Sequence, residues 1–157
     1  MIILIAIFRY AMILGSFMLS SHCFSQLHEY SFEEVDQLVK EEPKNIVVFL
    51  HTDWCSYCAM MDKTVFDNPD IVNILNQYYY YTPLNAEIDK EIQFGGNTFK
   101  FKPTGYKTGV HELAAALGSI NGDLSYPTLV VLNEKYEITF QYSGLLDAKT
   151  VKEILLN

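Results

Sequence analysis

Cys55 and Cys58 are the residues of this chain best suited to chemistry. They are separated by Ser56 and Tyr57, follow the apolar run 46–50, and begin a segment rich in helix-forming residues. At a helix start, unpaired amide N–H groups and the positive end of the helix dipole stabilise a thiolate. We therefore expect Cys55 to be the more acidic thiol and the nucleophile. Cys58, one turn further along, is expected to be the resolving thiol.

Two other uses of the cysteine pair fit the sequence less well. A structural zinc site needs four ligands, and the sequence has neither a second cysteine pair nor a clustered histidine pair to complete one. An inert disulfide across two intervening residues closes too small a loop to stabilise the fold much. The remaining cysteine, Cys23, lies in the N-terminal segment, so the pair belongs to no larger disulfide scaffold. The sequence thus favours redox chemistry at Cys55 and Cys58, without a metal.

The N-terminal segment differs from the rest of the chain. Residues 1–10 are apolar apart from Arg9, a second apolar block spans 11–19, and 23–25 has the small-x-small pattern of a cleavage site. This pattern predicts a secretory signal peptide at 1–25, and therefore export to the periplasm or the extracellular space. Because Arg9 follows an apolar run instead of preceding one, an uncleaved membrane anchor is the alternative.

Composition limits what the rest of the chain can be. A length of 157 residues leaves room for one domain, and a hydrophobic fraction of 50% is ample for a core. Without the predicted signal peptide, which holds Arg9 and no acid, 19 acidic side chains face 10 lysines, a net charge of −9. Such a balance disfavours binding to nucleic acid or to anionic lipid. No nucleic-acid partner is expected.

Capping and periodicity predict the elements of the first half. Ser31 and Glu34 form a capping-box pattern, and Asn68-Pro69 is a helix-start pattern. The near-continuous apolar run after Asn45 indicates a strand buried on both faces. The predicted elements are a helix at 32–40, a strand at 45–50, helices at 55–65 and 69–77, and a strand at 78–84.

Turn residues divide the second half. Gly95-Gly96-Asn97 lies between alternating segments, which is typical of a hairpin. Asp147 is a plausible N-cap for a closing amphipathic helix. The predicted elements are a hairpin of 91–94 with 98–102 closed by 103–105, a helix at 110–117 ended by Gly118, strands within 124–132 and at 136–142, and a helix up to residue 156.

Taken together, these motifs resemble the thioredoxin superfamily. Trp54 followed by the cysteine pair, Pro127 entering a buried strand, and the order β-α-β-α-β-β-α carry the resemblance, and Asp53-Trp54-Cys55 is similar to domains such as the C-terminal domain of DsbD. The resemblance implies an α/β thioredoxin fold over 26–157, with a central mixed sheet flanked by helices. A β-hairpin insertion at about 88–109, before the third helix, is an addition to the minimal fold. We expect it either to cover the active site or to form a partner surface.

The resemblance also implies roles outside the cysteine pair. Pro127 would be a cis-proline opposite the cysteines, and the backbone of Tyr126 would pair with the bound substrate chain by strand addition. Trp54 would form part of the docking surface. The structural alternatives are a turn residue for Pro127 and core filling for Trp54.

One position departs from the family pattern. The family carries a buried aspartate six residues before the first cysteine, as proton acceptor for the second thiol, and this chain has Phe49 there. Asp62 lies four residues after Cys58 on the same helical face and matches an acid of the DsbD-like domain. We take Asp62 as the candidate proton acceptor, ahead of Asp53 and His51, with an ordinary solvated side chain as the alternative.

Other polar residues are predicted to be structural. His111, on a short predicted helix, and the four tyrosines at 78–81 fit a packing role better than a ligand role.

These observations predict an exported thiol:disulfide oxidoreductase that reduces protein disulfides. Cys55 would form a mixed disulfide, and Cys58 would then displace the product and leave the redox disulfide Cys55–Cys58. A membrane or soluble thiol donor would restore the dithiol, and no cofactor is implied. The alternatives are a disulfide oxidase or isomerase, and a non-catalytic chaperone or binding module that uses the inserted hairpin.

Overall fold

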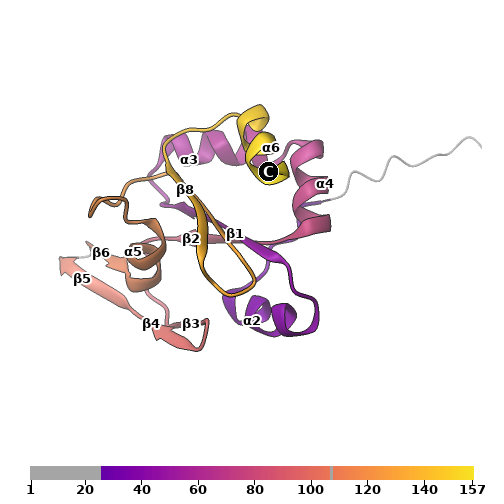
Figure 1. Ribbon diagram of the computed structural model, residues 1–157. Coiled ribbons are helices and arrows are strands. Elements are labelled where there is room, and N and C mark those ends of the chain that lie inside the picture. Colours follow the sequence, from indigo (N-terminus) through magenta and orange to yellow (C-terminus); the bar gives the residue numbers. More distant parts are fainter. Residues whose placement is uncertain (1–25, 107) are drawn as a thin grey trace, which may run out of the picture.

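A four-stranded mixed sheet forms the centre of the molecule (Figure 1). The computed structural model describes residues 26–106 and 108–157, so the predicted signal peptide at 1–25 lies outside the described residues. The strand order is β2-β1-β7-β8, in which β1 pairs with β2 in parallel and the other pairs are antiparallel. The strands are β1 (Asn45–His51), β2 (Tyr79–Asn85), β7 (Thr128–Leu132) and β8 (Ile138–Ser143). The predicted thioredoxin fold with a mixed sheet is confirmed.

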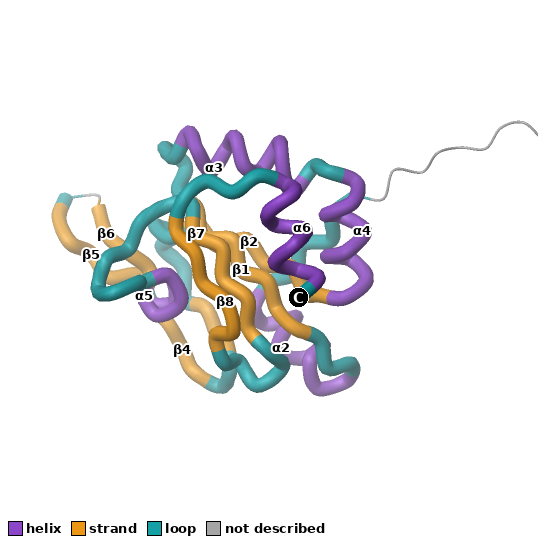
Figure 2. Tube along the Cα trace, turned by 45° about the horizontal axis from the view of Figure 1, so that its top comes forward, coloured by secondary structure: helices purple, strands orange, loops and turns teal. Residues whose placement is uncertain are grey.

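Helices cover both faces of this sheet (Figure 2). One face carries α2 (Phe32–Glu41) and α5 (Glu112–Gly118). The other carries α3 (Ser56–Met61), the π-helical η1 (Asp62–Phe66), α4 (Pro69–Tyr78) and α6 (Ala148–Leu156). Side chains of β1 alternate between two cores, with Val48 in the first and Val47 in the second, which explains its unbroken apolar sequence.

The predicted helix starts are confirmed by their capping contacts. Ser31 and Glu34 form a reciprocal capping box at α2, and the Asn68 side chain caps α4 ahead of Pro69. At α6, the Asp147 carboxylate accepts the Thr150 N–H at 2.8 Å. Local sequence therefore determines where these helices begin.

Two predicted strand boundaries are wrong. Tyr78 is the last residue of α4 and not the first of β2. Tyr136 has a positive φ of 65° and lies in the turn before β8, which starts only at Ile138. The cause is Asn133, whose carbonyl accepts the Tyr136 N–H at 2.9 Å and whose side chain accepts the Glu137 N–H at 3.0 Å. These bonds hold the chain in the turn beyond its predicted end.

The segment before α5 forms two hairpins instead of the predicted one. The first pairs β3 (Ile92–Phe94) with β4 (Asn97–Phe99), through a turn in which Gly95 and Gly96 both have positive φ. The second pairs β5 (Phe101–Gly105) with β6 (Thr108–His111). The predicted helix start at Val110 is therefore wrong, since α5 begins at Glu112. Gly118 is its last helical residue, with Ser119 as the C-cap.

The first hairpin is part of the main core. Phe94 is buried and packs edge-to-face on Phe32 of α2, with ring centroids 4.9 Å apart. The Gly95 N–H also donates to the Asp36 carboxylate of α2, at 3.0 Å. This hairpin thus extends the layer that covers one sheet face.

The segment 26–30 lies along the outer edge of β2. Glu29 forms a parallel bridge with Tyr81, and the Tyr30 N–H donates to the Tyr81 carbonyl at 2.9 Å. The His28 N–H binds the Asn76 side chain at 2.9 Å. This edge segment places Glu29 beside the second core.

Within residues 26–106 and 108–157, no helix is long and apolar enough to cross a membrane.

Candidate active site

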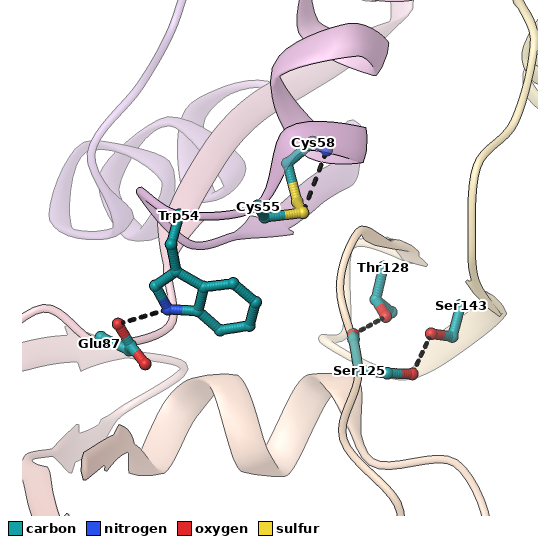
Figure 3. Close-up of a disulfide and its surroundings, with 7 residues drawn as sticks. All are labelled: Trp54, Cys55, Cys58, Glu87, Ser125, Thr128 and Ser143. Atoms are coloured by element: carbon teal, nitrogen blue, oxygen red, sulfur yellow. Dashed lines mark hydrogen bonds between the residues drawn. A yellow bond between two sulfur atoms is a disulfide. The ribbon is translucent and has the colours of Figure 1, made fainter. Parts of the chain in front are cut away.

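A disulfide joins Cys55 and Cys58 where β1 passes into α3 (Figure 3). The Cα atoms lie 5.2 Å apart. Cys55 is the N-cap of α3, and its Sγ accepts the Cys58 N–H at 3.1 Å. Cys55 is 7% exposed and Cys58 3%, so Cys55 is the more accessible of the two. The same hydrogen bond would stabilise a Cys55 thiolate once the disulfide is reduced.

The turn between β1 and α3 holds the disulfide at the carboxyl end of β1. The Cys55 N–H donates to the Thr52 carbonyl at 3.2 Å, and the Cys55 carbonyl accepts the Ala59 N–H at 3.1 Å. The first bond closes the turn after β1, and the second begins the helix. Both cysteines thereby become members of the core formed by α3, η1, α4 and α6.

The loop before β7 lies next to the cysteine pair. The Tyr126–Pro127 peptide bond is cis, as the family resemblance implied, and Tyr126 packs against the cluster that holds both cysteines. The Pro127 carbonyl accepts the Gly144 N–H at 2.8 Å. In the part of the chain that the structure describes, no hydrogen bond engages the Tyr126 backbone. That backbone is therefore available to an added strand.

Trp54 lies on the surface and does not fill the core. It is 68% exposed, and its Nε1–H donates to the Glu87 carboxylate at 3.0 Å. Its ring meets Tyr126 edge-to-face, with centroids 6.2 Å apart. Burial, followed by the Glu87 charge, raises the pKa of Tyr126 to about 12, so its hydroxyl stays neutral. Tyr57 and Met60 of α3 are exposed as well, so the segment that carries the cysteines presents three large exposed side chains.

An open hollow of about 310 Å³ borders the disulfide. Its wall includes both cysteines, and it also includes Phe49, at the position where the family carries its acid. Phe49 stacks on His51 at 5.8 Å and contacts Phe66 at 4.7 Å between ring centroids. An aromatic cluster therefore replaces the family's buried carboxylate.

The predicted proton acceptors all line this hollow. Asp62, Asp53 and His51 share its wall with Cys58. Burial lowers the pKa of His51, although the charges of Asp53 and Asp62 oppose this, so neutral imidazole is favoured. The structure brings these candidates to the same hollow as the cysteines.

Sequence reasoning missed two carboxylates at the site. Glu29 also lines the hollow, and its pKa is raised by burial and then by the Asp62 charge. Glu87 binds Trp54. Neither lies near the cysteines in sequence, and no local motif marks them, so only the fold reveals them. Among the described residues, no group of His, Cys, Asp and Glu side chains could hold a metal ion.

His111 has a structural role away from the disulfide. It is fully buried, and its Nδ1 accepts the Leu113 N–H at 3.2 Å as the N-cap of α5. Its Nε2 therefore carries the proton and donates to the Lys90 carbonyl at 2.9 Å. The prediction of a structural histidine is confirmed.

Solved structures share this architecture at low sequence identity. They include a DsbH oxidoreductase, with 14% identity over 87% of this chain and 88% of that one and a TM-score of 0.59. A thioredoxin from Thermus thermophilus has 18% identity over 84% of this chain and 86% of its own, with a TM-score of 0.60. The reduced C-terminal domain of DsbD from Neisseria meningitidis has 16% identity over 79% of this chain and 90% of its own, with a TM-score of 0.52. At such identities these likenesses support the fold alone.

Sequence comparison gives the family. A search of curated proteins finds no significant match. A family model for thioredoxin-like domains matches residues 32–157, which span every described helix and strand from α2 to α6. The protein therefore belongs to the thioredoxin-like domain family.

Proposed function

We propose that this protein is an exported thiol:disulfide oxidoreductase that reduces disulfides in other proteins. The observation that carries the proposal is the Cys55–Cys58 disulfide at the start of α3, beside the cis Tyr126–Pro127 bond. Exposed Trp54, which meets Tyr126 edge-to-face next to the cysteine pair, suits a protein substrate, because large exposed apolar side chains at a site favour an interaction surface.

The cysteines would act in sequence. In the reduced protein, the Cys55 thiolate attacks one sulfur of a substrate disulfide and forms a mixed disulfide, releasing the other substrate sulfur. Cys58 then gives up its proton, with Asp62 as the acceptor, and attacks Cys55. The Cys55–substrate bond breaks, Cys55–Cys58 forms, and the substrate has gained two electrons. Tyr126 would hold the substrate chain by backbone pairing, and Trp54 would contact it.

Charge around the disulfide favours the reducing direction. Oxidising members of this fold stabilise their thiolate form strongly. Here Glu29, Asp53 and Asp62 line the hollow, whereas no lysine or arginine is found among the described residues of its wall. Because negative neighbours destabilise a thiolate, the dithiol gives up electrons more readily. Thioredoxins have a reduction potential of about −270 mV, and strong oxidants of this fold one of about −120 mV. We expect the potential of this protein to lie closer to the thioredoxin value.

Insulin reduction by the purified protein tests the activity. We expect precipitation of reduced insulin with a chemical thiol donor, loss of that activity in Cys55→Ser, and accumulation of a mixed disulfide in Cys58→Ser. Wild-type protein that does not accelerate reduction would favour a binding module. A measured potential near that of strong oxidants would favour an oxidase or isomerase.

Export is the part of the proposal that rests on the sequence pattern of residues 1–25. Expression in a Gram-negative host and N-terminal sequencing of the periplasmic protein test it. A mature chain that starts at Gln26 supports a cleaved signal peptide, whereas full-length protein in the membrane fraction supports an anchor. Exported protein would need a thiol donor, membrane-bound or soluble, to regenerate its dithiol.

A further inference from the structure

Glu29 and Asp62 come together from distant parts of the chain. Both line the hollow beside Cys58, and both also line a second hollow of about 260 Å³ next to it. Glu29 is held there by the bridge between the edge segment and Tyr81 of β2, whereas Asp62 lies at the junction of α3 and η1. Two separate elements therefore present carboxylates to the same space.

The wall of the same hollow includes a residue with a buried, unpartnered hydroxyl. Thr52 is 3% exposed, lines the hollow, and its Oγ1 has no hydrogen-bond partner in the described part of the chain. Buried polar atoms are normally satisfied by protein or by water. An unsatisfied Oγ1 at this wall calls for a polar partner, and an enclosed water beside the hollow would supply one.

We propose that Glu29 and Asp62 act as one carboxylate pair that shares a proton and exchanges it with Cys58 through this hollow. The pair would take over the task of the family's acid, whose position is occupied by Phe49. This inference rests on the proposed redox function and adds Glu29 to it as a proton-sharing residue. The two carboxylates differ in role from Cys55 and Cys58, since they form no bond to substrate.

The electrostatics of Glu29 agree with this geometry. Burial and then the Asp62 charge raise its pKa above the ordinary value, which makes its carboxylate a better proton acceptor near neutral pH. Burial, Glu29 and Asp62 together raise the pKa of Tyr81 well above its usual range, so its hydroxyl stays protonated. The titratable groups that surround the pair are His51, Asp53, Cys58, Asp67 and Tyr81.

The step balances as a proton-coupled thiol exchange. The Cys58 S–H bond breaks, and its proton passes to the pair. The Cys58 sulfur forms a bond to Cys55 Sγ while the Cys55–substrate bond breaks, and the substrate sulfur leaves with that electron pair and is protonated by solvent. When a donor thiol later reduces Cys55–Cys58, the pair returns the proton to Cys58.

The test separates the two chemical steps. Mixed-disulfide formation is measured in a Cys58→Ser background by mass spectrometry with a disulfide-bonded model peptide. Closure of Cys55–Cys58 is measured in single turnovers by Trp54 fluorescence and acid quench, from about pH 5 to pH 8. The variants are Glu29→Gln, Glu29→Asp and Asp62→Asn, with Glu134→Gln in the distant β7–β8 turn as the matched control.

We expect Glu29→Gln to slow closure about tenfold near neutral pH and to move the midpoint of the pH–rate curve upward, with the first step unchanged. Glu29→Asp should recover most of the rate. The double variant Glu29→Gln/Asp62→Asn should slow closure by a much smaller factor than the product of the two single-variant factors, because the pair acts as a unit.

A closure curve of Glu29→Gln that superimposes on wild type would overturn the proposal. The proposal would also be overturned if Glu29→Gln slowed closure by the same factor at every pH and Glu29→Asp did not restore the rate. Such behaviour indicates a structural role for Glu29. Wild-type protein that forms no mixed disulfide even in the Cys58→Ser background would instead overturn the redox function itself, and this inference with it.

Discussion

At the scale of single residues, Phe49 accounts for much of what is unusual at this site. Its ring lies 3% exposed among His51, Phe66 and the cysteines, where a carboxylate would be desolvated. The acids stand instead at the rim of the hollow, where they keep partial contact with water. Under the proposed function, proton transfer would therefore take place at the wall of an open space and not in the core.

Trp54 should matter for binding and little for stability. Because it is 68% exposed, Trp54→Ala removes little buried area, and we expect a change of about 0.5 kcal/mol or less in unfolding free energy. The KM for a protein disulfide should rise severalfold, while KM for a small disulfide stays near wild type. Steady-state assays with both substrates check this, with Tyr78→Ala, 55% exposed on α4, as the matched control. An equal effect on both substrates would contradict a docking role.

Glu29 should lower stability at neutral pH. Its folded-state pKa is raised above the ordinary 4.5, so the folded protein holds the proton more tightly than the unfolded chain, and stability falls as pH rises through the folded pKa. Glu29→Gln should therefore be more stable than wild type at pH 7, by about 0.5 kcal/mol or less because the charge is partly solvated, and the gain should vanish near pH 4. Urea unfolding at both pH values measures this. A variant less stable at pH 7 would contradict it.

At the scale of elements, local signals explain what the sequence could predict. The capping box at Ser31, the Asn68-Pro69 start and the β1–α3 junction are each encoded within a few residues, and all three appear in the structure. The second hairpin was missed because its strands contain Pro103, Gly105 and Gly109, which are typical of loops. Gly109 in fact lies against the Phe101 ring, where a side chain would collide.

His111 should be required for the β6–α5 junction and not for chemistry. His111→Ala removes both the α5 cap and the bond to the Lys90 carbonyl at a fully buried site, and we expect a loss of about 3 kcal/mol. His111→Asn keeps a cap acceptor and should recover about 1 kcal/mol. Urea unfolding tests both, with exposed His28→Ala as control. Slower single-turnover closure in folded His111→Ala protein would point instead to a role at the disulfide.

At the scale of the whole molecule, the limits of sequence reasoning lie in long-range contacts. The fold order and the cysteine pair follow from local patterns, but the pairing of Glu29 with Tyr81 joins residues far apart in the chain. The same holds for Trp54 and Glu87, which meet only because β1 and β2 end side by side. Such contacts depend on the finished sheet, so no window of sequence contains them.

The inserted hairpins should differ sharply in their contribution to the fold. Phe94 of the first is 4% exposed and lies between Phe32 at 4.9 Å and Tyr136 at 5.1 Å, so Phe94→Ala should cost about 3–5 kcal/mol. Tyr106, in the second, is 89% exposed, and Tyr106→Ala should cost about 0.5 kcal/mol or less. Urea unfolding of both variants measures the difference. Small losses of unfolding free energy in both variants would mean that neither hairpin is needed for the core. The expected difference makes the first hairpin a layer of the core. Only the second hairpin would then be free to evolve as a contact surface.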